Sequence, residues 1–205
     1  MRKGSFAILA GIFCFFLAAG LTAYNLWDNS RAGENAEKAL AQLDLLIAEP
    51  SASVENIRNE IEYPDYVLNP FMALPVVEIE GNAYVGKLTI PALDKELPIL
   101  SEWSYSHLKI APCLYAGTPY RSGFVICAHN YYYHFGDLRS LNEGDEIFFT
   151  DNDGNEFAYV VKGSEILQPK SVADMKSKQW DLTLFTCTVG GQSRVTVRCE
   201  KIKTS

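Results

Sequence analysis

A cysteine and an arginine are predicted to face each other across a tight turn near the end of the chain. Leu182–Cys187 and residues 194–199 are rich in Thr, Val, Leu and Phe and flank Gly190 and Gly191, a pattern typical of a β-hairpin with a two-residue turn. This register places Cys187 opposite Arg194, with Cβ atoms about 5 Å apart. A thiolate beside a permanent cation is a nucleophile suited to attack on a carbonyl carbon.

The same register keeps a second arginine away from the thiol. Arg198 faces Thr183, four residues along the strand and roughly 13 Å from Cys187 at about 3.3 Å per residue. A strand cysteine is more commonly a buried, inert thiol, but a cation is poorly placed beside such a thiol. We therefore predict that Cys187 is reactive and that Arg194, not Arg198, serves it.

A histidine completes the chemistry. An apolar strand at 123–129 ends in His129, which can take the proton of a thiol and later give a proton to a departing amine. The donors of Arg194 can bind the carbonyl oxygen as it becomes an oxyanion. Together, His129, Cys187 and Arg194 predict acyl transfer through a thioester.

His134 is the rival base. We favour His129 because it ends the strand, and we expect His134 to pack or to make a surface hydrogen bond. Asn130 and Asp137 could orient an imidazole, as third groups do in other triads. Both are left out of the predicted catalytic set.

Three segments resemble the sortases, the cysteine transpeptidases of Gram-positive cell surfaces. Residues 183–187, Thr-Leu-Phe-Thr-Cys, match their Thr-Leu-x-Thr-Cys signature, and Arg194 matches the position of their arginine. Residues 128–138 resemble the segment around their catalytic histidine, and residues 84–91 look like their first barrel strand. The resemblance runs from about residue 83 to the end.

This resemblance implies a substrate class and a reaction. In sortases a C-terminal sorting signal of the Leu-Pro-x-Thr-Gly type is cut after the Thr, and the acyl group passes to an amine of a cell-wall precursor or a pilin lysine. It implies His129, Cys187 and Arg194 as catalytic residues. Some sortases are helped by calcium, but no acidic cluster of this sequence is assigned to it, and we predict no cofactor or metal. The segment from Val161 to Leu182 is too short for the long helical insertion usual in the haem-pathway enzymes of class B. The subclass stays open between a general housekeeping enzyme, a class D-like role and a class B relative.

The N-terminus predicts a membrane anchor. Residues 1–4 carry Arg2 and Lys3 and are expected to be cytoplasmic, and residues 5–27 form an uncharged run long enough to span a bilayer. This predicts a single-pass protein of the cell membrane with its catalytic domain on the extracellular face. A cleaved signal peptide is the alternative, but the run is long for a signal core.

Residues 28–82 are predicted to form a stalk and linker. Ala36, Leu40, Leu43 and Ile47 recur at helical spacing before Pro50. We favour a solvated stalk over a partner-binding helix, with a second short helix at 53–61. The segment 69–71, Asn-Pro-Phe, faintly resembles the lid of pilus-building sortases, and a domain-edge turn is favoured instead.

Residues 83–205 are predicted to form the catalytic β-barrel. Eight short strands, separated by turn signals and short helical turns at 135–141 and 171–177, indicate a mainly all-β fold, a sortase-like eight-stranded barrel, rather than a doubly wound sheet. The strands are expected at 84–90, 97–100, 113–116, 123–129, 146–150, 156–166, 182–189 and 192–200.

Composition excludes other functions. A net charge of −7, with no phosphate-binding glycine loop, argues against a nucleic-acid partner. The acidic segment 151–156 has the wrong glycine position for a calcium loop and is expected to be a hairpin turn. Cys113, Cys127 and Cys199 are expected to be buried thiols, and a bridge between Cys127 and Cys199 stays open.

Two alternatives compete with the transpeptidase. A membrane-tethered Cys/His amidase or peptidase would use the same residue types, but papain-like enzymes place the cysteine first, at a helix N-terminus. A non-catalytic extracellular β-barrel binding module would leave Cys187 inert towards thiol reagents.

Overall fold

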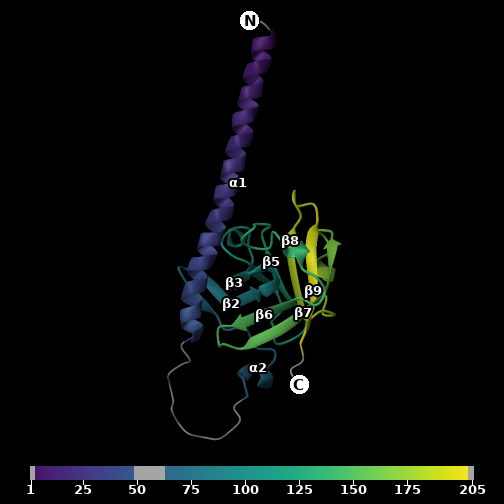
Figure 1. The fold of residues 1–205 in the computed structure, drawn as a ribbon. Coiled ribbons are helices and arrows are strands. Elements are labelled where there is room, and N and C mark those ends of the chain that lie inside the picture. The colour runs from purple at the N-terminus through teal and green to yellow at the C-terminus, as the bar shows by residue number, and fades with distance from the viewer. Residues whose placement is uncertain (1–2, 49–62, 203–205) are drawn as a thin grey trace.

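The computed structural model describes residues 3–48 and 63–202 (Figure 1). In chain order the elements are α1 (Lys3–Ala48), α2 (Asp65–Leu68), β1 (Val77–Ile79), β2 (Asn82–Ile90), η1 (Pro91–Leu93), β3 (Lys95–Leu100), η2 (His107–Lys109), β4 (Cys113–Ala116), β5 (Phe124–Ala128), η3 (Leu138–Ser140), β6 (Glu146–Asp151), β7 (Glu156–Leu167), α3 (Val172–Met175), β8 (Leu182–Cys187) and β9 (Arg194–Lys201).

Eight strands close into the predicted barrel. Their order is β2-β3-β4-β5-β8-β9-β7-β6, and an additional pairing of β2 with β6 completes the ring. The strand β1, which sequence reasoning missed, adds a ninth strand on β2 by a hairpin whose turn residues Glu80 and Gly81 both have positive φ. The β5–β8 pair is parallel, whereas the β8–β9 and β7–β9 pairs are antiparallel.

Alternation along β5 and β8 divides the core into two layers. Phe124, Ile126 and Leu184 belong to the cluster that fills the barrel, whereas Cys127 and Phe185 belong to a second cluster on the outer face. Because successive strand residues point to opposite faces, positions 129 and 187 continue the outer row. The chemistry is therefore expected on the outside of the barrel, above the second cluster.

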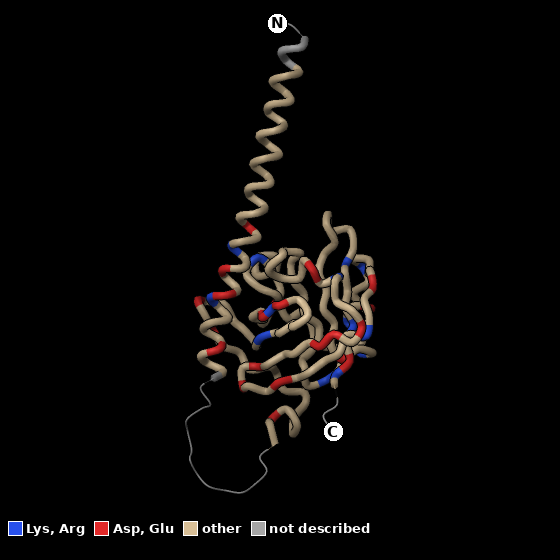
Figure 2. The backbone as a smooth tube through the Cα atoms, in the orientation of Figure 1, with Lys and Arg blue, Asp and Glu red and all other residues tan. Residues whose placement is uncertain are grey.

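The helix α1 is longer and more firmly attached than predicted. It runs unbroken from the uncharged segment into the charged one, where Ala32, Ala36, Ala39 and Leu43 are buried. Figures 1 and 2 show its uncharged part projecting away from the barrel and its charged part lying along it. Residues 28–48 are thus not a solvated stalk, because the small residues bring the helix close enough to exclude water. The proposed helix at 53–61 lies outside the described residues.

The apolar part of α1 meets the requirements of a membrane span. Among the described residues it is the helix that is long and apolar enough to cross a bilayer, with a mean hydropathy of 2.1 over its most apolar window. By length and composition, then, this helix could anchor the chain.

Two other segments lie away from the predicted chemistry. Residues 152–155 form the turn between β6 and β7, where the buried Asp151 carboxylate accepts hydrogen bonds from Asn155 and Tyr120, so the hairpin turn is confirmed. Phe71 is exposed, and the Arg121 guanidinium lies 4.1 Å from its ring centre. Arg121 precedes β5 and His129 follows it, so the segment 69–71 sits at the far end of that strand and does not cover Cys187.

Candidate active site

Three neighbouring strands bring the predicted residues into one row. Ala128 pairs with Thr186 in the parallel β5–β8 register, and the Thr186 hydroxyl donates to the Ala128 carbonyl oxygen at 2.9 Å. His129, the next residue, therefore leaves β5 beside Cys187, the last residue of β8. On the other side Cys187 pairs with Arg194, as predicted. Cys187 thus ends a strand that lies between the strand His129 follows and the strand Arg194 begins, and neighbouring strands lie about 5 Å apart.

The turn between β8 and β9 explains the second pairing, although it is wider than the predicted two-residue turn: Cys187–Arg194 is the last pair of the ladder, and the Gly191 amide donates to the Thr188 carbonyl oxygen at 2.8 Å. Gly190 and Gly191 both have positive φ, and the Thr188 amide donates to the Ser193 carbonyl oxygen at 2.9 Å. These positive φ values suit glycine and rarely suit other residues. The turn therefore fixes the register that sets the arginine opposite the thiol.

An apolar groove of about 210 Å³ opens beside this row. Cys187 and Arg194 stand at one end, Cys127 and Phe185 form part of the floor, and side chains from the loop before β4 and from the β7–β8 connection line the rest. The full lining is Trp103, Tyr105, Leu108, Tyr115, Cys127, Ala128, Pro169, Met175, Phe185, Cys187 and Arg194. Its walls suit an extended apolar peptide segment.

Aromatic packing supports the groove. The Tyr115 ring meets Phe185 edge-on with centroids 5.0 Å apart, and Trp103 lies 5.6 Å from Tyr115. Sequence reasoning missed these residues, since Trp103 and Tyr105 lie in an irregular segment with no periodicity. The density of aromatic residues at 103–115 was the one available signal.

Arg194 retains donors for a ligand. Both hydrogen bonds that the described residues make with its guanidinium use Nη1, which donates to the carbonyl oxygens of Gly191 and Ser193 at 3.0 and 3.1 Å. A guanidinium has five N–H donors, so Nε and Nη2 stay available at the groove. The two backbone contacts orient the side chain without neutralising it.

Arg198 is fully engaged elsewhere. It is 5% exposed and donates from Nε to Glu165 Oε1 at 2.7 Å, from Nη1 to the Thr183 hydroxyl at 2.9 Å and from Nη2 to the Asp174 carbonyl oxygen at 2.9 Å. These bonds join β7, β8, β9 and α3. All three nitrogens of Arg198 are therefore engaged in holding the groove wall, and its side chain is buried.

His129 is half-buried and held in its neutral form. Burial lowers the pKa of its imidazole, the Lys109 ammonium lowers it further, and the Asp28 carboxylate opposes both. The ring also packs against Tyr131, with centroids 4.8 Å apart. A neutral imidazole at neutral pH can accept the proton of a thiol.

His134 lies beneath the site, not in it. It is completely buried, and neither ring nitrogen has a hydrogen-bond partner among the described residues; the backbone of Ala32 and Ile110 is near but outside bonding geometry. Burial lowers the pKa of His134 to about 4. Of the two roles expected for His134, the structure therefore shows packing and excludes a surface hydrogen bond.

The remaining cysteines of the barrel are structural. Cys127 pairs with Cys113 across β4 and β5 on the outer face, and burial raises the pKa of the Cys113 thiol to about 12 and that of Cys127 as well. Cys199 belongs to the barrel interior. The bridge left open between Cys127 and Cys199 is not formed, because the two residues lie on opposite faces and all five cysteines are free.

No metal centre emerges from the part of the chain that the structure describes: no group of three or more His, Cys, Asp or Glu side chains there could hold an ion. The chemistry that this arrangement can perform is nucleophilic, from a thiol with a neutral base on one side and a permanent cation on the other.

Two comparisons of the sequence point to one family. The sequence model of the Sortase domain matches residues 88–202. Sortase A of Bacillus anthracis is 23% identical over 194 residues, which cover 91% of this chain and 89% of that protein.

Solved structures share the fold. A sortase D5 transpeptidase of Clostridium perfringens matches with a TM-score of 0.57 at 18% identity, covering 85% of this chain and 99% of that one. Sortase A of Corynebacterium diphtheriae matches with a TM-score of 0.54 at 21% identity, covering 91% and 97%. Because the family match covers more than half of a chain that also has the family's barrel, this protein belongs to the sortases, a family of cysteine transpeptidases.

Proposed function

We propose that this protein is a membrane-anchored sortase that cleaves an LPXTG-like sorting signal through a thioester at Cys187. The acyl group then passes to an amine of a cell-wall precursor or a pilin. The observation that carries the proposal is the row His129–Cys187–Arg194 at the end of an aromatic groove.

Acylation uses all three residues. The proton of the Cys187 thiol passes to the neutral imidazole of His129, and the thiolate sulfur attacks the carbonyl carbon of the Thr-Gly bond. The free N–H donors of Arg194 bind the oxygen as it gains negative charge. The C–N bond then breaks, the departing amine takes the proton from the His129 imidazolium, and a thioester is left at Cys187.

Transfer reverses these steps with a new amine. The acceptor nitrogen attacks the thioester carbonyl carbon, and His129 takes the proton that this nitrogen loses. The C–S bond breaks, which returns the thiolate, and an amide joins the surface protein to the acceptor. Water in place of the amine would give hydrolysis.

The anchor places this chemistry at the cell surface. Arg2 and Lys3 precede the uncharged run and favour a cytoplasmic N-terminus. The β8–β9 turn lies on the side of the barrel from which the apolar part of α1 departs (Figure 1). Protease added to intact protoplasts is expected to remove residues 83–205, and complete protection would contradict this orientation.

A peptide panel tests the chemistry. The purified full-length chain in detergent micelles is incubated with sorting-signal peptides that vary around Leu-Pro-x-Thr-Gly, with and without an amine acceptor. We expect an acyl adduct on Cys187 by mass spectrometry and transfer product when the amine is present. Hydrolysis that no amine diverts would favour a peptidase, and a Cys187 inert to both peptides and iodoacetamide would favour a binding module.

A further inference from the structure

The first turn of α1 beyond the uncharged run holds the loop that carries His129. Asp28 directly follows Trp27 and is only 8% exposed. The Tyr131 hydroxyl donates to its Oδ2, and Arg31 donates from Nη2 to its Oδ1 at 2.7 Å. A buried carboxylate is costly unless it is paired, so these two partners fix its place. They also lower the pKa of Asp28, Tyr131 more than Arg31.

Neighbouring residues extend this contact along the loop. The Tyr132 amide donates to Asn29 Oδ1 at 2.8 Å. A Cβ added to Gly33 would lie 2.7 Å from the Tyr133 ring, so glycine permits the close approach of helix and loop. Each of the three consecutive tyrosines at 131–133 thus contacts a different residue of α1.

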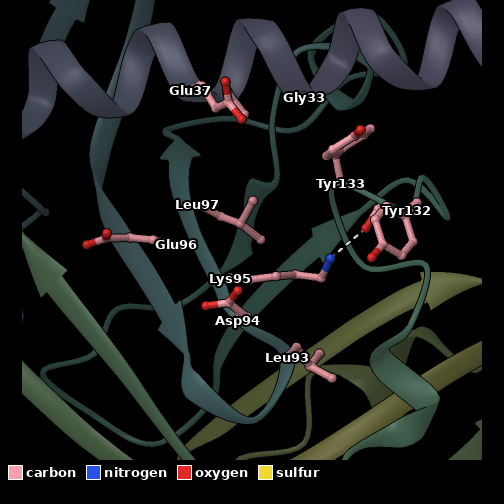
Figure 3. Close-up of a pocket in the computed structure, with 10 residues that line it drawn as sticks. Gly33, Glu37, Leu93, Asp94, Lys95, Glu96, Leu97, Tyr132 and Tyr133 are labelled. Carbon is pink, nitrogen blue, oxygen red and sulfur yellow. Dashed lines mark hydrogen bonds between the residues drawn. The ribbon is translucent and has the colours of Figure 1, made fainter.

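The opposite side of the loop is held by β3. Lys95 donates from Nζ to the Tyr132 carbonyl oxygen, lies 4.9 Å from the Tyr132 ring centre and pairs with Asp137 at 3.3 Å. Figure 3 shows Lys95 reaching towards Tyr132, with Tyr133 and Gly33 at the helix above. The loop is therefore fixed between a helix and a strand.

Tyr131 connects this contact to His129. Its ring packs against the imidazole with centroids 4.8 Å apart, while its carbonyl oxygen accepts hydrogen bonds from the amides of His134 and Gly136 at 3.0 and 2.8 Å. The Phe135 amide donates to the His129 carbonyl oxygen at 3.3 Å. A shift of the Tyr131 ring would therefore move the ring of His129.

From these contacts we infer that Asp28 and Tyr131 are positioning residues: the helix that anchors the chain orients His129 through the Asp28–Tyr131 hydrogen bond. The inference rests on the proposed transpeptidase function, in which His129 transfers the proton. Helix α1 is thus both anchor and part of the active-site framework. Catalytic geometry is sensitive to such support, because a displacement of about 1 Å can cost roughly 10²-fold in rate.

Four variants of the full-length chain in micelles test the inference. Tyr131→Phe removes the hydroxyl and keeps the ring, Asp28→Ala removes the acceptor, and Asp28→Asn keeps an acceptor oxygen without the charge. Glu34→Ala is the control, since Glu34 is an exposed carboxylate on the same helix. Each is assayed for kcat and KM with the best peptide of the panel, together with the double variant of Tyr131→Phe and Asp28→Ala.

We expect kcat to fall roughly tenfold in Tyr131→Phe and in Asp28→Ala, which corresponds to one hydrogen bond to a charged group, with KM unchanged. The double variant should be no slower than the slower single variant, because both remove the same contact. Asp28→Asn should recover part of the loss. Losses that multiply in the double variant, follow the folded fraction, or do not exceed that of Glu34→Ala would overturn the inference.

A second readout needs no substrate. The charged and titratable groups around the His129 imidazole are Asp28 from α1, Lys109 from η2, Cys187 from β8 and His134 from its own loop, with Tyr131 against the ring. Asp28→Ala should lower the pKa of His129, measured by NMR on histidine-labelled protein, whereas Glu34→Ala should leave it unchanged. An unchanged His129 titration in Asp28→Ala overturns the inference. If no peptide is turned over by the unaltered protein, the proposed function fails while this titration still decides whether α1 acts on His129.

Discussion

For each residue of the proposed site, a second residue of the same type lies nearby but is buried. At the rim stand His129, Cys187 and Arg194, each of them only partly buried. Beneath or beside them lie the three counterparts, which are His134, Cys127 and Arg198, all of them buried. The two sets contain the same three residue types, and the two arginines lie on the same face of β9.

The difference between the sets lies in what their polar atoms can still do. Arg194 keeps free donors, whereas three elements use those of Arg198. Both thiols line the groove, but burial in its floor holds the Cys127 thiol protonated, whereas Cys187 is only partly buried. Residue type alone therefore does not define a site; position at the carboxyl ends of β5 and β8 does.

The comparison of Cys187 with Cys127 gives the largest expected effect on activity. Cys187→Ala should abolish both the acyl adduct and turnover, because no other thiol lies at the end of the groove. Iodoacetamide added to the folded protein, followed by peptide mass mapping, should modify Cys187 and leave Cys127 unmodified. Preferential labelling of Cys127 would reverse the comparison.

The exposed arginine comes next. Arg194→Ala should lower kcat by about 10²–10³, the usual cost of losing one oxyanion donor, while circular dichroism shows an unchanged barrel. Arg194→Lys should recover little, because an ammonium lacks the planar fork of donors. Turnover of Arg194→Ala near that of the unaltered protein would remove the arginine from the mechanism.

The buried arginine should affect stability more than chemistry. Sequence reasoning alone predicts that Arg198→Ala keeps most activity, but its three hydrogen bonds add a structural cost of about 2–3 kcal/mol in the free energy of unfolding. Since α3 contributes Met175 to the groove, KM should rise more than kcat falls. Denaturant titration and steady-state kinetics check both parts, and a dead but fully stable variant would mean that the two arginines were assigned the wrong way round.

Local patterns were enough to predict the hairpin and most strands. The glycine pair determines the turn, the turn determines the register, and the register sets Cys187 opposite Arg194. Strand limits were off by a few residues, because hydrogen bonds, not hydrophobicity, decide where pairing stops. The catalytic roles of the three residues stay predictions.

Contacts between distant segments could not be predicted in this way. The parallel pairing that brings His129 beside Cys187 joins residues about 58 positions apart, such as Ala128 and Thr186. The packing of α1 depends on Gly33 fitting a tyrosine ring a hundred residues later. Helical periodicity at 36–47 indicated an apolar face but not the barrel as its partner, and so the segment was taken for a solvated stalk.

The buried member of the histidine pair, His134, gives the smallest effect on catalysis and a distinct effect on stability. His134 has a pKa of about 4 in the folded chain, against about 6.5 in the unfolded chain. Above pH 6.5 both states are neutral, and His134 adds no pH dependence. As the pH falls from 6.5 to about 4, the unfolded chain binds a proton that the folded chain refuses, so the free energy of unfolding falls by up to about 3 kcal/mol.

His134→Phe should remove this dependence. The ring loses no hydrogen bond on replacement, since neither nitrogen has a partner among the described residues, and a phenyl ring can keep the contact with Tyr131. Denaturant unfolding at pH 7 and pH 4.5 should then give a smaller difference in stability than the unaltered protein gives, with turnover at pH 7 within a few fold. The same comparison with His129→Phe should show the opposite pattern, because that residue is half-exposed and acts in catalysis: turnover is lost and the pH dependence of stability is largely kept. A variant at position 134 that loses turnover as completely as one at position 129 would make His134 part of the mechanism and end the distinction between rim and interior.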